Sequence, residues 1–421
     1  MENPKIRFKG FTKDWEQRKL GEVLISLQNN TLSRADLSNE TGIAKNVHYG
    51  DVLIKFGDVL DVSREQLPMI KDEKILDKYK ASFLQNGDVI IADTAEDTTV
   101  GKCSEIAGLR DEVVLSGLHT IPYRPVEKFA TGYLGYYLNS GAYHDQLIPL
   151  MQGIKVTSIS KSAMQDTDIV YPKSTEEQAM IGSYFQSIDH LITLHQRKCE
   201  QTKKLKKYML QKMFPQNGAK VPEIRFDGFT YDWEQRKLID YLEVSSEKNR
   251  DNRFTKEDVL SVSGEYGIVN QIEFQGRSFA GASVSNYGVV ENGDVVYTKS
   301  PLKSNPYGII KTNKGIPGIV STLYAVYKPK EITDSKFVQI YFELDSRMNS
   351  YMHPLVNKGA KNDMKVSAEN ALKGMVSFPK KDEQEMISLY FSTIDHLITL
   401  HQRKCDELKK MKKYMLQNMF I

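Results

Sequence analysis

The 421-residue chain lacks most features that identify a secreted protein or a membrane protein. It has only three cysteines, Cys103, Cys199 and Cys405, which are far apart and odd in number, so neither a disulfide framework nor a zinc site is indicated. No run of about 18 apolar residues occurs, so we expect no membrane-spanning helix, and the N-terminus lacks the apolar stretch of a secretory signal. These absences favour a cytoplasmic protein.

The chain also lacks a large excess of charge of either sign, and it lacks known catalytic motifs. The 57 lysines and arginines against 54 acidic residues leave a net charge of +3, which is too small to identify a nucleic-acid binder. No phosphate-binding glycine loop, nucleophile elbow or H-E-x-x-H motif is present. Asn305-Pro306-Tyr307 is similar to the Asn-Pro-Pro-Tyr motif of DNA amino-methyltransferases, but it lacks the second proline, so a proline turn is the better interpretation. We therefore predict no catalytic residue and no bound metal.

What the sequence does contain is an internal duplication. Residues 4–20 (PKIRFKGFTKDWEQRKL) recur almost unchanged at 222–238, and IDHLITLHQRKC occurs at both 188–199 and 394–405. Between these matched segments the two halves differ sharply. So long a period indicates a duplicated domain and not a solenoid. Two near-identical frames with different inserts predict one scaffold that presents two distinct recognition surfaces.

Each half is predicted to end in a long helix. Apolar or small residues recur every three or four positions from 175 to about 213, and again from about 382 to 419, which is typical of one helical stripe. A long helix with one narrow stripe needs a partner helix. The twin helix is the expected partner, in antiparallel pairing. The acidic residues at 176–178 and 382–384 are interpreted as groups that favour the positive end of a helix dipole.

The segments before the helices are predicted to be mixed α/β domains. Strand-like apolar runs with Gly and Pro punctuation occupy 51–60, 87–94 and 113–125 in the first half and 287–299 and 319–329 in the second. Tyrosine-rich helical stretches follow near 129–148 and 335–352. The predicted organisation is a first domain at 1–174, a long helix at 175–216, a second domain at 217–380 and a second long helix at 381–421.

Polar loops at matching places in the two halves are candidates for binding DNA. They span 92–102 and 152–160 in the first half and 297–308 and 358–367 in the second, and they are rich in Ser, Thr, Asn and Lys, which reach base edges and phosphates. Any single residue among them could equally belong to an ordinary polar loop. The candidate DNA-binding residues are Thr94, Thr98, Thr99, Lys102, Lys155, Thr157, Ser158, Lys299, Ser300, Lys303, Ser304, Lys361, Asn362 and Lys365.

The C-terminal parts of both predicted helices are basic. Residues 197–213 carry seven lysines and arginines against one acid, and residues 403–419 carry six against two. Such a run is most often a solvated face; the alternatives are phosphate contacts or docking to an acidic partner surface. The candidate partner-binding residues are Arg197, Lys198, Lys204, Tyr208, Arg403, Lys404, Lys410 and Tyr414.

Taken in order and twice over, these motifs resemble the specificity subunit of type I restriction–modification enzymes, and the resemblance covers the whole chain. Trp-Glu-Gln-Arg-Lys-Leu opens each half like a target recognition domain of that family, and a Gly-Asp-Val strand and a Gly-x-Lys loop follow. A proline and then Glu-Gln lead into each long helix, from Pro172 and from Pro379. The loops around Gly153 and Gly359 carry fewer Thr and Ser than the family pattern, which leaves their base contacts open.

The resemblance implies a mixed α/β fold with two pseudo-twofold-related target recognition domains separated by two long antiparallel helices. Each domain would read one half of a bipartite, asymmetric site in double-stranded DNA, and the helices would set the gap. Two methyltransferase subunits would dock on the helices and modify adenines, and motor–nuclease subunits would join for cleavage. S-adenosylmethionine, ATP and magnesium would belong to those partners, with no cofactor on this chain.

Two alternatives stay open on the residues alone. A self-contained methyltransferase would bind S-adenosylmethionine as the isolated chain, although the missing glycine-rich motif argues against it. A coiled-coil adaptor would bridge proteins, and its DNA binding would be weak and independent of sequence even with its partners present.

Overall fold

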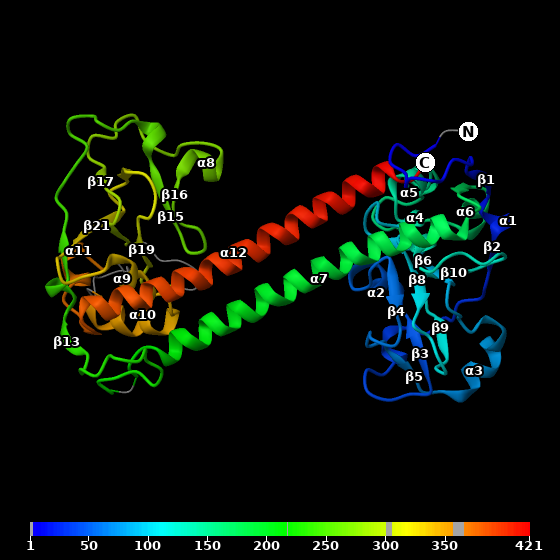
Figure 1. The fold of residues 1–421 in the computed structure, drawn as a ribbon, viewed down its shortest axis with the longest axis horizontal. Coiled ribbons are helices and arrows are strands. Elements are labelled where there is room, and N and C mark those ends of the chain that lie inside the picture. The colour runs from blue at the N-terminus through cyan, green and yellow to red at the C-terminus, as the bar shows by residue number, and fades with distance from the viewer. Residues whose placement is uncertain (1–2, 217, 300–304, 357–365) are drawn as a thin grey trace. The chain divides into compact units, whose positions relative to one another are not determined.

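The computed structural model of the chain describes residues 3–216, 218–299, 305–356 and 366–421. The chain folds as two compact units: unit 1 combines Met1–Gln196 with Gln402–Ile421, and unit 2 is Arg197–His401. Both boundaries fall inside the long helices α7 (Thr175–Lys212) and α12 (Lys381–Asn418). Each unit therefore contains one segment of each long helix (Figure 1).

Unit 1 combines short strands with short helices. Its strands are β1 (Glu16–Lys19), β2 (Leu24–Ser26), β3 (Ala44–Val47), β4 (Val59–Asp61), β5 (Met69–Ile70), β6 (Val89–Ala92), β7 (Thr94–Ala95), β8 (Cys103–Ala107), β9 (Val114–Ser116), β10 (Thr120–Pro125), β11 (Thr157–Ser158) and β12 (Asp168–Tyr171). Its short helices are α1 (Leu20–Val23), α2 (Tyr49–Ile54), α3 (Glu73–Tyr79), α4 (Tyr133–Leu138), α5 (Gly141–His144) and α6 (Lys161–Gln165). The central sheet has the order β2-β10-β6-β8-β4, antiparallel except for the parallel pair β4 and β8.

Unit 2 repeats the central part of this arrangement. Its strands are β13 (Glu234–Lys237), β14 (Leu242–Val244), β15 (Leu260–Ser263), β16 (Gly267–Asn270), β17 (Gly288–Val290), β18 (Val295–Thr298), β19 (Ile310–Thr312), β20 (Gly318–Val320), β21 (Tyr324–Pro329) and β22 (Met375–Phe378). Its short helices are α8 (Gln271–Gln275), α9 (Ser335–Tyr341), α10 (Asp345–Met352) and α11 (Ala368–Ala371). The sheet order β14-β21-β18-β19 matches β2-β10-β6-β8 of unit 1, and the pair β13-β22 matches β1-β12. The predicted mixed α/β class is confirmed.

The apolar stripe of the long helices lies in the cores. In unit 1, Phe185 and Ile188 of α7 share a core cluster with Leu408 of α12 and with Phe420. In unit 2, Leu210 of α7 shares a cluster with residues that include Phe391 of α12. Within each unit the two helix segments run antiparallel, because the start of one helix packs against the end of the other. Burial of this stripe, at roughly 25 cal/mol per Å² of apolar surface, holds each domain to its helix pair.

The predicted strand over 51–60 is wrong. Residues 49–54 form α2, and only β4 at the end of the run is a strand. Asp51 and Val52 of α2 are buried, and so is Phe56 just after the helix. The side chain of His48 accepts a hydrogen bond from the backbone N–H of Gly50 and so caps the helix start.

No helix within the described ranges is both long enough and apolar enough to cross a bilayer.

Candidate nucleic-acid interface

Strand pairing brings two of the predicted DNA-binding loops of unit 1 together. β7, from the loop at 92–102, pairs antiparallel with β11, from the loop at 152–160, so that Ser158 lies opposite Thr94. The backbone N–H of Ile159 donates to the carbonyl of Asp93 at 2.9 Å and extends the pairing. Segments about sixty residues apart in the sequence therefore form one surface, which carries Thr94, Thr157 and Ser158.

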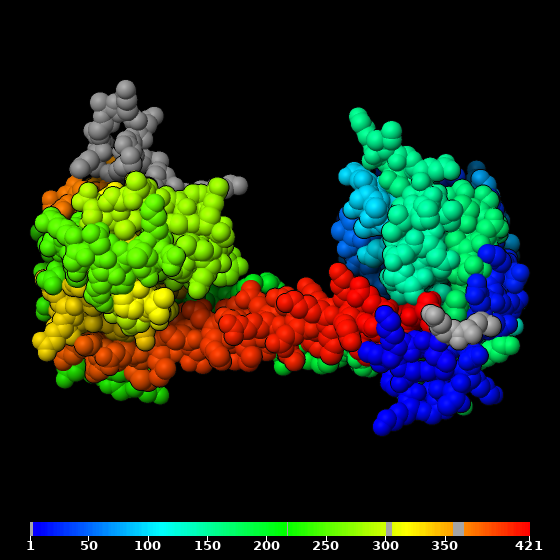
Figure 2. All heavy atoms as spheres, turned by 90° about the horizontal axis from the view of Figure 1, so that it is seen from above, coloured from blue at the N-terminus to red at the C-terminus, as the bar shows by residue number. Residues whose placement is uncertain are grey.

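The end of this surface projects into solvent. Figure 2 shows the part of the chain around 150–157, blue-green on the colour bar, standing out from its unit. Lys155 is exposed there and Ile154 is fully exposed. Gly153 allows the tight bend, because its φ is +108° and a Cβ would lie 2.0 Å from the carbonyl oxygen of Val156. Nearby, Thr98 and Thr99 are also exposed, and Thr99 donates to the carboxylate of Asp97.

Two predicted phosphate-binding lysines are already engaged within the protein. The ammonium of Lys102 donates to the carbonyl of Leu53 at 2.7 Å, and burial lowers the pKa of this lysine. Lys299 donates to the carbonyl of Thr322 at 2.7 Å, and burial, followed by the nearby charge of Lys248, lowers its pKa. Of the described lysine candidates in the loops, Lys155 is the exposed one.

Several predicted site residues of the second half lie outside the described residues. They are Ser300, Lys303, Ser304, Lys361, Asn362 and Lys365. They stay predictions.

The predicted partner-binding residues all lie on exposed faces of the long helices. Arg197, Lys198, Lys204 and Tyr208 are exposed on α7, and Arg403, Lys404, Lys410 and Tyr414 are exposed on α12. Tyr208 is 48% exposed and Tyr414 is 58% exposed, which is high for aromatic side chains on structured helices. Each unit thus presents one copy of the same basic and aromatic face.

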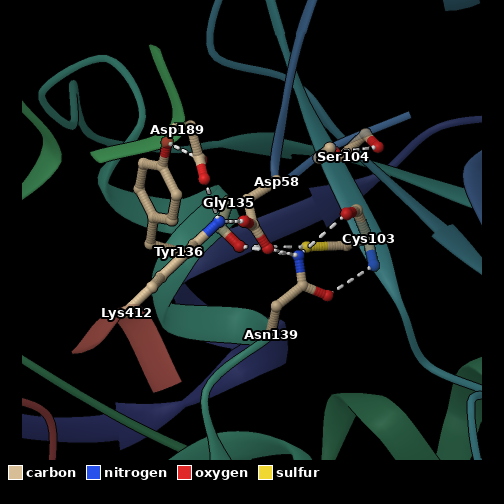
Figure 3. Close-up of polar contacts among 9 residues, drawn as sticks. Asp58, Cys103, Ser104, Gly135, Tyr136, Asn139, Asp189 and Lys412 are labelled. Carbon is tan, nitrogen blue, oxygen red and sulfur yellow. Dashed lines mark hydrogen bonds and ion pairs between the residues drawn. The ribbon is translucent and has the colours of Figure 1, made fainter. Parts of the chain in front are cut away.

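Two other lysines of the repeat do not belong to these exposed faces. Lys412 of α12 lies 2.6 Å from a carboxylate oxygen of Asp58 and 2.6 Å from one of Asp189, and it sits over the ring of Tyr136, whose hydroxyl donates to Asp189 (Figure 3). Burial lowers the pKa of Lys412, but the two carboxylates raise it by more, so the pKa ends above its usual value. Lys412 is therefore held as an ammonium between a domain residue and a helix residue.

The same ion triad is built a second time in unit 2. Lys206 of α7, which has the place of Lys412 in the repeated KKYMLQ segment, contacts Asp395 at 2.6 Å and Glu343 at 2.5 Å. Asp395 has the place of Asp189 in the repeated IDHLIT segment. The domain carboxylate differs, because Asp58 precedes β4 whereas Glu343 follows α9. The helix-borne partners are thus repeated, and each domain supplies its own acid.

A chain of hydrogen bonds continues from the first triad toward the loop at 92–102. The amide nitrogen of Asn139 donates to Asp58 at 2.8 Å and to the carbonyl of Cys103 at 2.9 Å, and its oxygen accepts from the Cys103 backbone N–H (Figure 3). Cys103 begins β8, directly after the loop. This network fixes the base of the candidate DNA-binding loop against the helix pair.

The repeated Arg, Trp and Glu-Gln motifs have a structural role that the sequence analysis missed. In unit 1, Arg7 forms a two-pronged ion pair with Glu177 (2.6 and 2.9 Å), and the indole N–H of Trp15 donates to the same carboxylate at 3.3 Å. Arg225, Trp233 and Glu383 repeat this arrangement in unit 2. The helix dipole therefore explains only part of the acidic helix start, because the glutamates also clamp the N-terminal segment of each half. The identical motif spacing was the signal for this contact.

A hollow of about 450 Å³ adjoins the paired loops of unit 1. It is lined by Ser26, Leu27, Gln28, Asn29, Asp93, Thr120, Ile121, Pro122, Ile159, Ser160 and Lys161. Asp93, Ile159 and Ser160 belong to the predicted DNA-binding loops, whereas Gln28 and Lys161 were not predicted, because they meet only through the β2-β10 pairing and the β7-β11 pairing.

The described residues were also compared with the side-chain groups that bind metal ions. In the four described ranges no group of three or more His, Cys, Asp or Glu side chains is placed to hold a metal ion. The three cysteines are buried and unpaired with one another.

Comparison with known proteins agrees with this architecture. Residues 12–204 match the family model of the type I restriction modification DNA specificity domain. The repeated motifs at 222–238 and 394–405 extend the same frame to the second half. Over nearly its whole length the chain is therefore similar to type I restriction–modification specificity subunits.

Two relatives match this chain over nearly their whole length. A putative type I restriction enzyme MjaX specificity subunit of Methanocaldococcus jannaschii is 24% identical over 439 residues, which cover 96% of this chain and 92% of the relative. The crystal structure of a type I restriction–modification S subunit from M. genitalium has a TM-score of 0.61 and 12% identity, and the match covers 100% of this chain and 99% of that one. This second likeness shows the shared fold.

This similarity bears on one of the alternatives. Specificity subunits are the non-catalytic recognition subunits of their complexes, which argues against the self-contained methyltransferase. The similarity also implies assembly with other subunits of a restriction–modification system and with DNA.

Proposed function

We propose that this specificity subunit reads a bipartite, asymmetric site in double-stranded DNA, one half per unit, and directs adenine methylation or cleavage by partner subunits. One observation carries the proposal: each unit presents the same exposed helix residues, Tyr208 and Tyr414 among them, whereas the predicted DNA-binding loops of the two halves differ in sequence. Repeated faces suit two copies of one partner, whereas different loops suit two different half-sites.

DNA contact in unit 1 is assigned to the surface formed by β7 and β11. Thr157 and Ser158 supply hydroxyl groups that donate to and accept from base edges, and Lys155 supplies an exposed charge for a phosphate. The Thr94 hydroxyl donates to Asp93, so it supplies an oxygen that accepts. In unit 2 the proposal rests on the matching sequence segments 297–308 and 358–367. Because the loops differ between the halves, the two half-sites are expected to differ.

The repeated helix faces are assigned to two methyltransferase subunits. Each face combines an exposed tyrosine with exposed lysine and arginine, which are groups enriched at protein interfaces or complementary to acidic surfaces. Motor–nuclease subunits would join this core for cleavage. S-adenosylmethionine, ATP and magnesium would be bound by these partners, and the long helices would set the gap between the half-sites.

A genome-wide adenine-methylation map of a host with and without this gene tests the DNA-reading role. We expect deletion to abolish methylation at one asymmetric motif with two short specified halves around a fixed unspecified gap. Methylation that is unchanged, in a host whose methyltransferase subunit is expressed, would contradict the proposal and favour the adaptor alternative.

Stoichiometry tests the assignment of the helix faces. Native mass spectrometry of the purified complex should show two methyltransferase subunits per chain for the wild type and one for either Tyr208→Ala or Tyr414→Ala. Tyr266→Ala is the control, because this tyrosine is equally exposed but lies outside the repeat. Two bound subunits in both single variants would remove the tyrosines from the interface.

A further inference from the structure

The hollow beside β7 and β11 has an arrangement of polar groups that suits one class of base edge. Asp93 lies on it directly before Thr94, the first residue of β7, and Gln28 and Lys161 lie on it from two other segments. This inference rests on the proposed function, because it assigns a ligand to part of the proposed DNA surface.

Polar groups that face the hollow have unused hydrogen-bonding capacity. Gln28 and Lys161 are exposed, and neither side chain bonds to any part of the chain that the structure describes. One carboxylate oxygen of Asp93, Oδ1, accepts from the Thr94 hydroxyl at 2.8 Å and lies 3.4 Å from Nδ1 of His119. Its second oxygen, Oδ2, has no partner among the described residues, so an acceptor is available beside the hollow.

The backbone at His119 is strained, and this strain orients the acceptor. His119 has φ of +55°, a left-handed conformation that is uncommon for residues other than glycine. Its carbonyl accepts from the backbone N–H of Asp93 at 3.1 Å, and its ring packs edge-on against Tyr49, with ring centroids 5.3 Å apart. Strained residues that the surroundings hold in place are concentrated at functional sites.

The matched position in unit 2 carries the opposite charge. Asp93 follows the Gly87-Asp88 turn by the same number of residues as Lys299 follows Gly293-Asp294, and Gly87 and Gly293 share a φ of +91°. The backbone N–H of Lys299 donates to the carbonyl of Leu323, as that of Asp93 does to the carbonyl of His119. The two units therefore hold an acid and a base at one structural position, and the Lys299 ammonium is bonded to the carbonyl of Thr322.

We propose that the hollow takes a base of the first half-site that presents an exocyclic amino group in the major groove, adenine or cytosine, with Asp93 as the acceptor. Guanine and thymine present acceptors at that edge and would be repelled by the carboxylate. Gln28 is placed on the same hollow to supply an amide donor and acceptor, and Lys161 a charge for the adjoining phosphate. His119 acts as a positioning residue, through Asp93.

Selection from a randomised duplex pool by the complex of this chain with its system's other subunits tests the assignment. We expect Asp93→Asn to lower the preference at one position of the first half-site about tenfold, within the range of one base contact, and to leave the second half-site unchanged. Gln28→Ala should weaken the same or an adjacent position, and Asp93→Lys should move the preference toward guanine. Asp111→Asn, an exposed acid that does not line the hollow, is the matched control and should select the wild-type motif.

The identity of the affected base pair separates the two chemistries, because an A·T pair assigns the acceptor to the adenine amino group and a G·C pair assigns it to the cytosine amino group. An unchanged motif in Asp93→Asn, an equal effect in Asp111→Asn, or a uniform loss of affinity for all sequences would each overturn the assignment. A wild-type complex that enriches no bipartite motif would instead overturn the proposed function itself, and the hollow's role with it.

Discussion

Removal of the Lys412 ammonium should destabilise unit 1 and leave unit 2 nearly unchanged. Lys412 is 17% exposed, and its two partners, Asp58 and Asp189, are 14% and 34% exposed. Lys412→Met keeps most of the side-chain volume and the packing on Tyr136 but leaves two carboxylates close together without a cation. Loss of one partner of a buried ion pair costs about 3–5 kcal/mol. Because Asp189 is about one third exposed and is screened by water, we expect about 3 kcal/mol.

The two tryptophans allow each unit to be followed separately. Trp15 is buried in unit 1 and Trp233 in unit 2, and the chain has no other tryptophan. In a Trp233→Phe background, urea unfolding followed by the remaining fluorescence reports unit 1. With a urea dependence of about 2 kcal/mol per molar, a loss of about 3 kcal/mol lowers the unfolding midpoint by about 1.5 M.

The matched control is Lys206→Met, which removes the equivalent ammonium from unit 2. In the Trp233→Phe background it should shift the Trp15 transition far less than Lys412→Met does, and in a Trp15→Phe background the order should reverse. Adding Asp58→Asn to Lys412→Met should restore much of the lost stability, because it removes the uncompensated charge. Equal shifts from both lysine variants, or no recovery in the double variant, would refute the assignment of a local ion triad.

Three further predictions concern other described residues. Burial raises the pKa of Glu105 to about 7, although the backbone N–H groups of Gly132 and Gly135 donate to its carboxylate. The pKa in the folded protein therefore lies above the unfolded value of 4.5. As a result, the stability of unit 1 should fall by about 3 kcal/mol as pH rises from 4.5 to 7. Urea unfolding of Glu105→Gln at several pH values should lack this part of the decline, and an unchanged pH dependence would contradict it. Lys155→Gln should reduce the salt slope of DNA binding by about one unit, measured by fluorescence anisotropy across potassium chloride concentrations. Lys102→Gln should leave the slope unchanged, because that ammonium is bonded to the carbonyl of Leu53. Equal slopes for both variants would count against the exposed loop as the phosphate contact. Gly153→Ala should weaken DNA binding by the complex and lower the urea midpoint of unit 1 by about 0.5–1.5 M, because backbone strain of about 1–3 kcal/mol corresponds to that shift at a urea dependence of about 2 kcal/mol per molar. Unaltered affinity would separate the projecting loop from the DNA.

Sequence motifs predicted the repeated frame well because their information is local or exactly repeated. The three- and four-residue spacing of apolar side chains predicted long helices that the structure places at 175–212 and 381–418. The strand prediction at 51–60 failed because an apolar run of that length fits a strand and a short helix equally well, and the cap at His48 decides between them. The matched loops at 92–102 and 297–308 were found because both halves place them after the same Gly-Asp strand.

The sequence by itself determined the duplication, the α/β class, the family and the basic, tyrosine-bearing helix faces. Tertiary structure alone decided which polar groups are free: Lys102 and Lys155 are indistinguishable in sequence, yet the ammonium of Lys102 is bonded to the carbonyl of Leu53 and Lys155 is exposed. Only the fold brought Asp93, Gln28 and Lys161 to one hollow, and only the fold placed Lys412 between Asp58 and Asp189. The physical reason is that hydrogen bonds and ion pairs depend on distances of about 3 Å between atoms, and pairing between strands far apart in the sequence sets those distances.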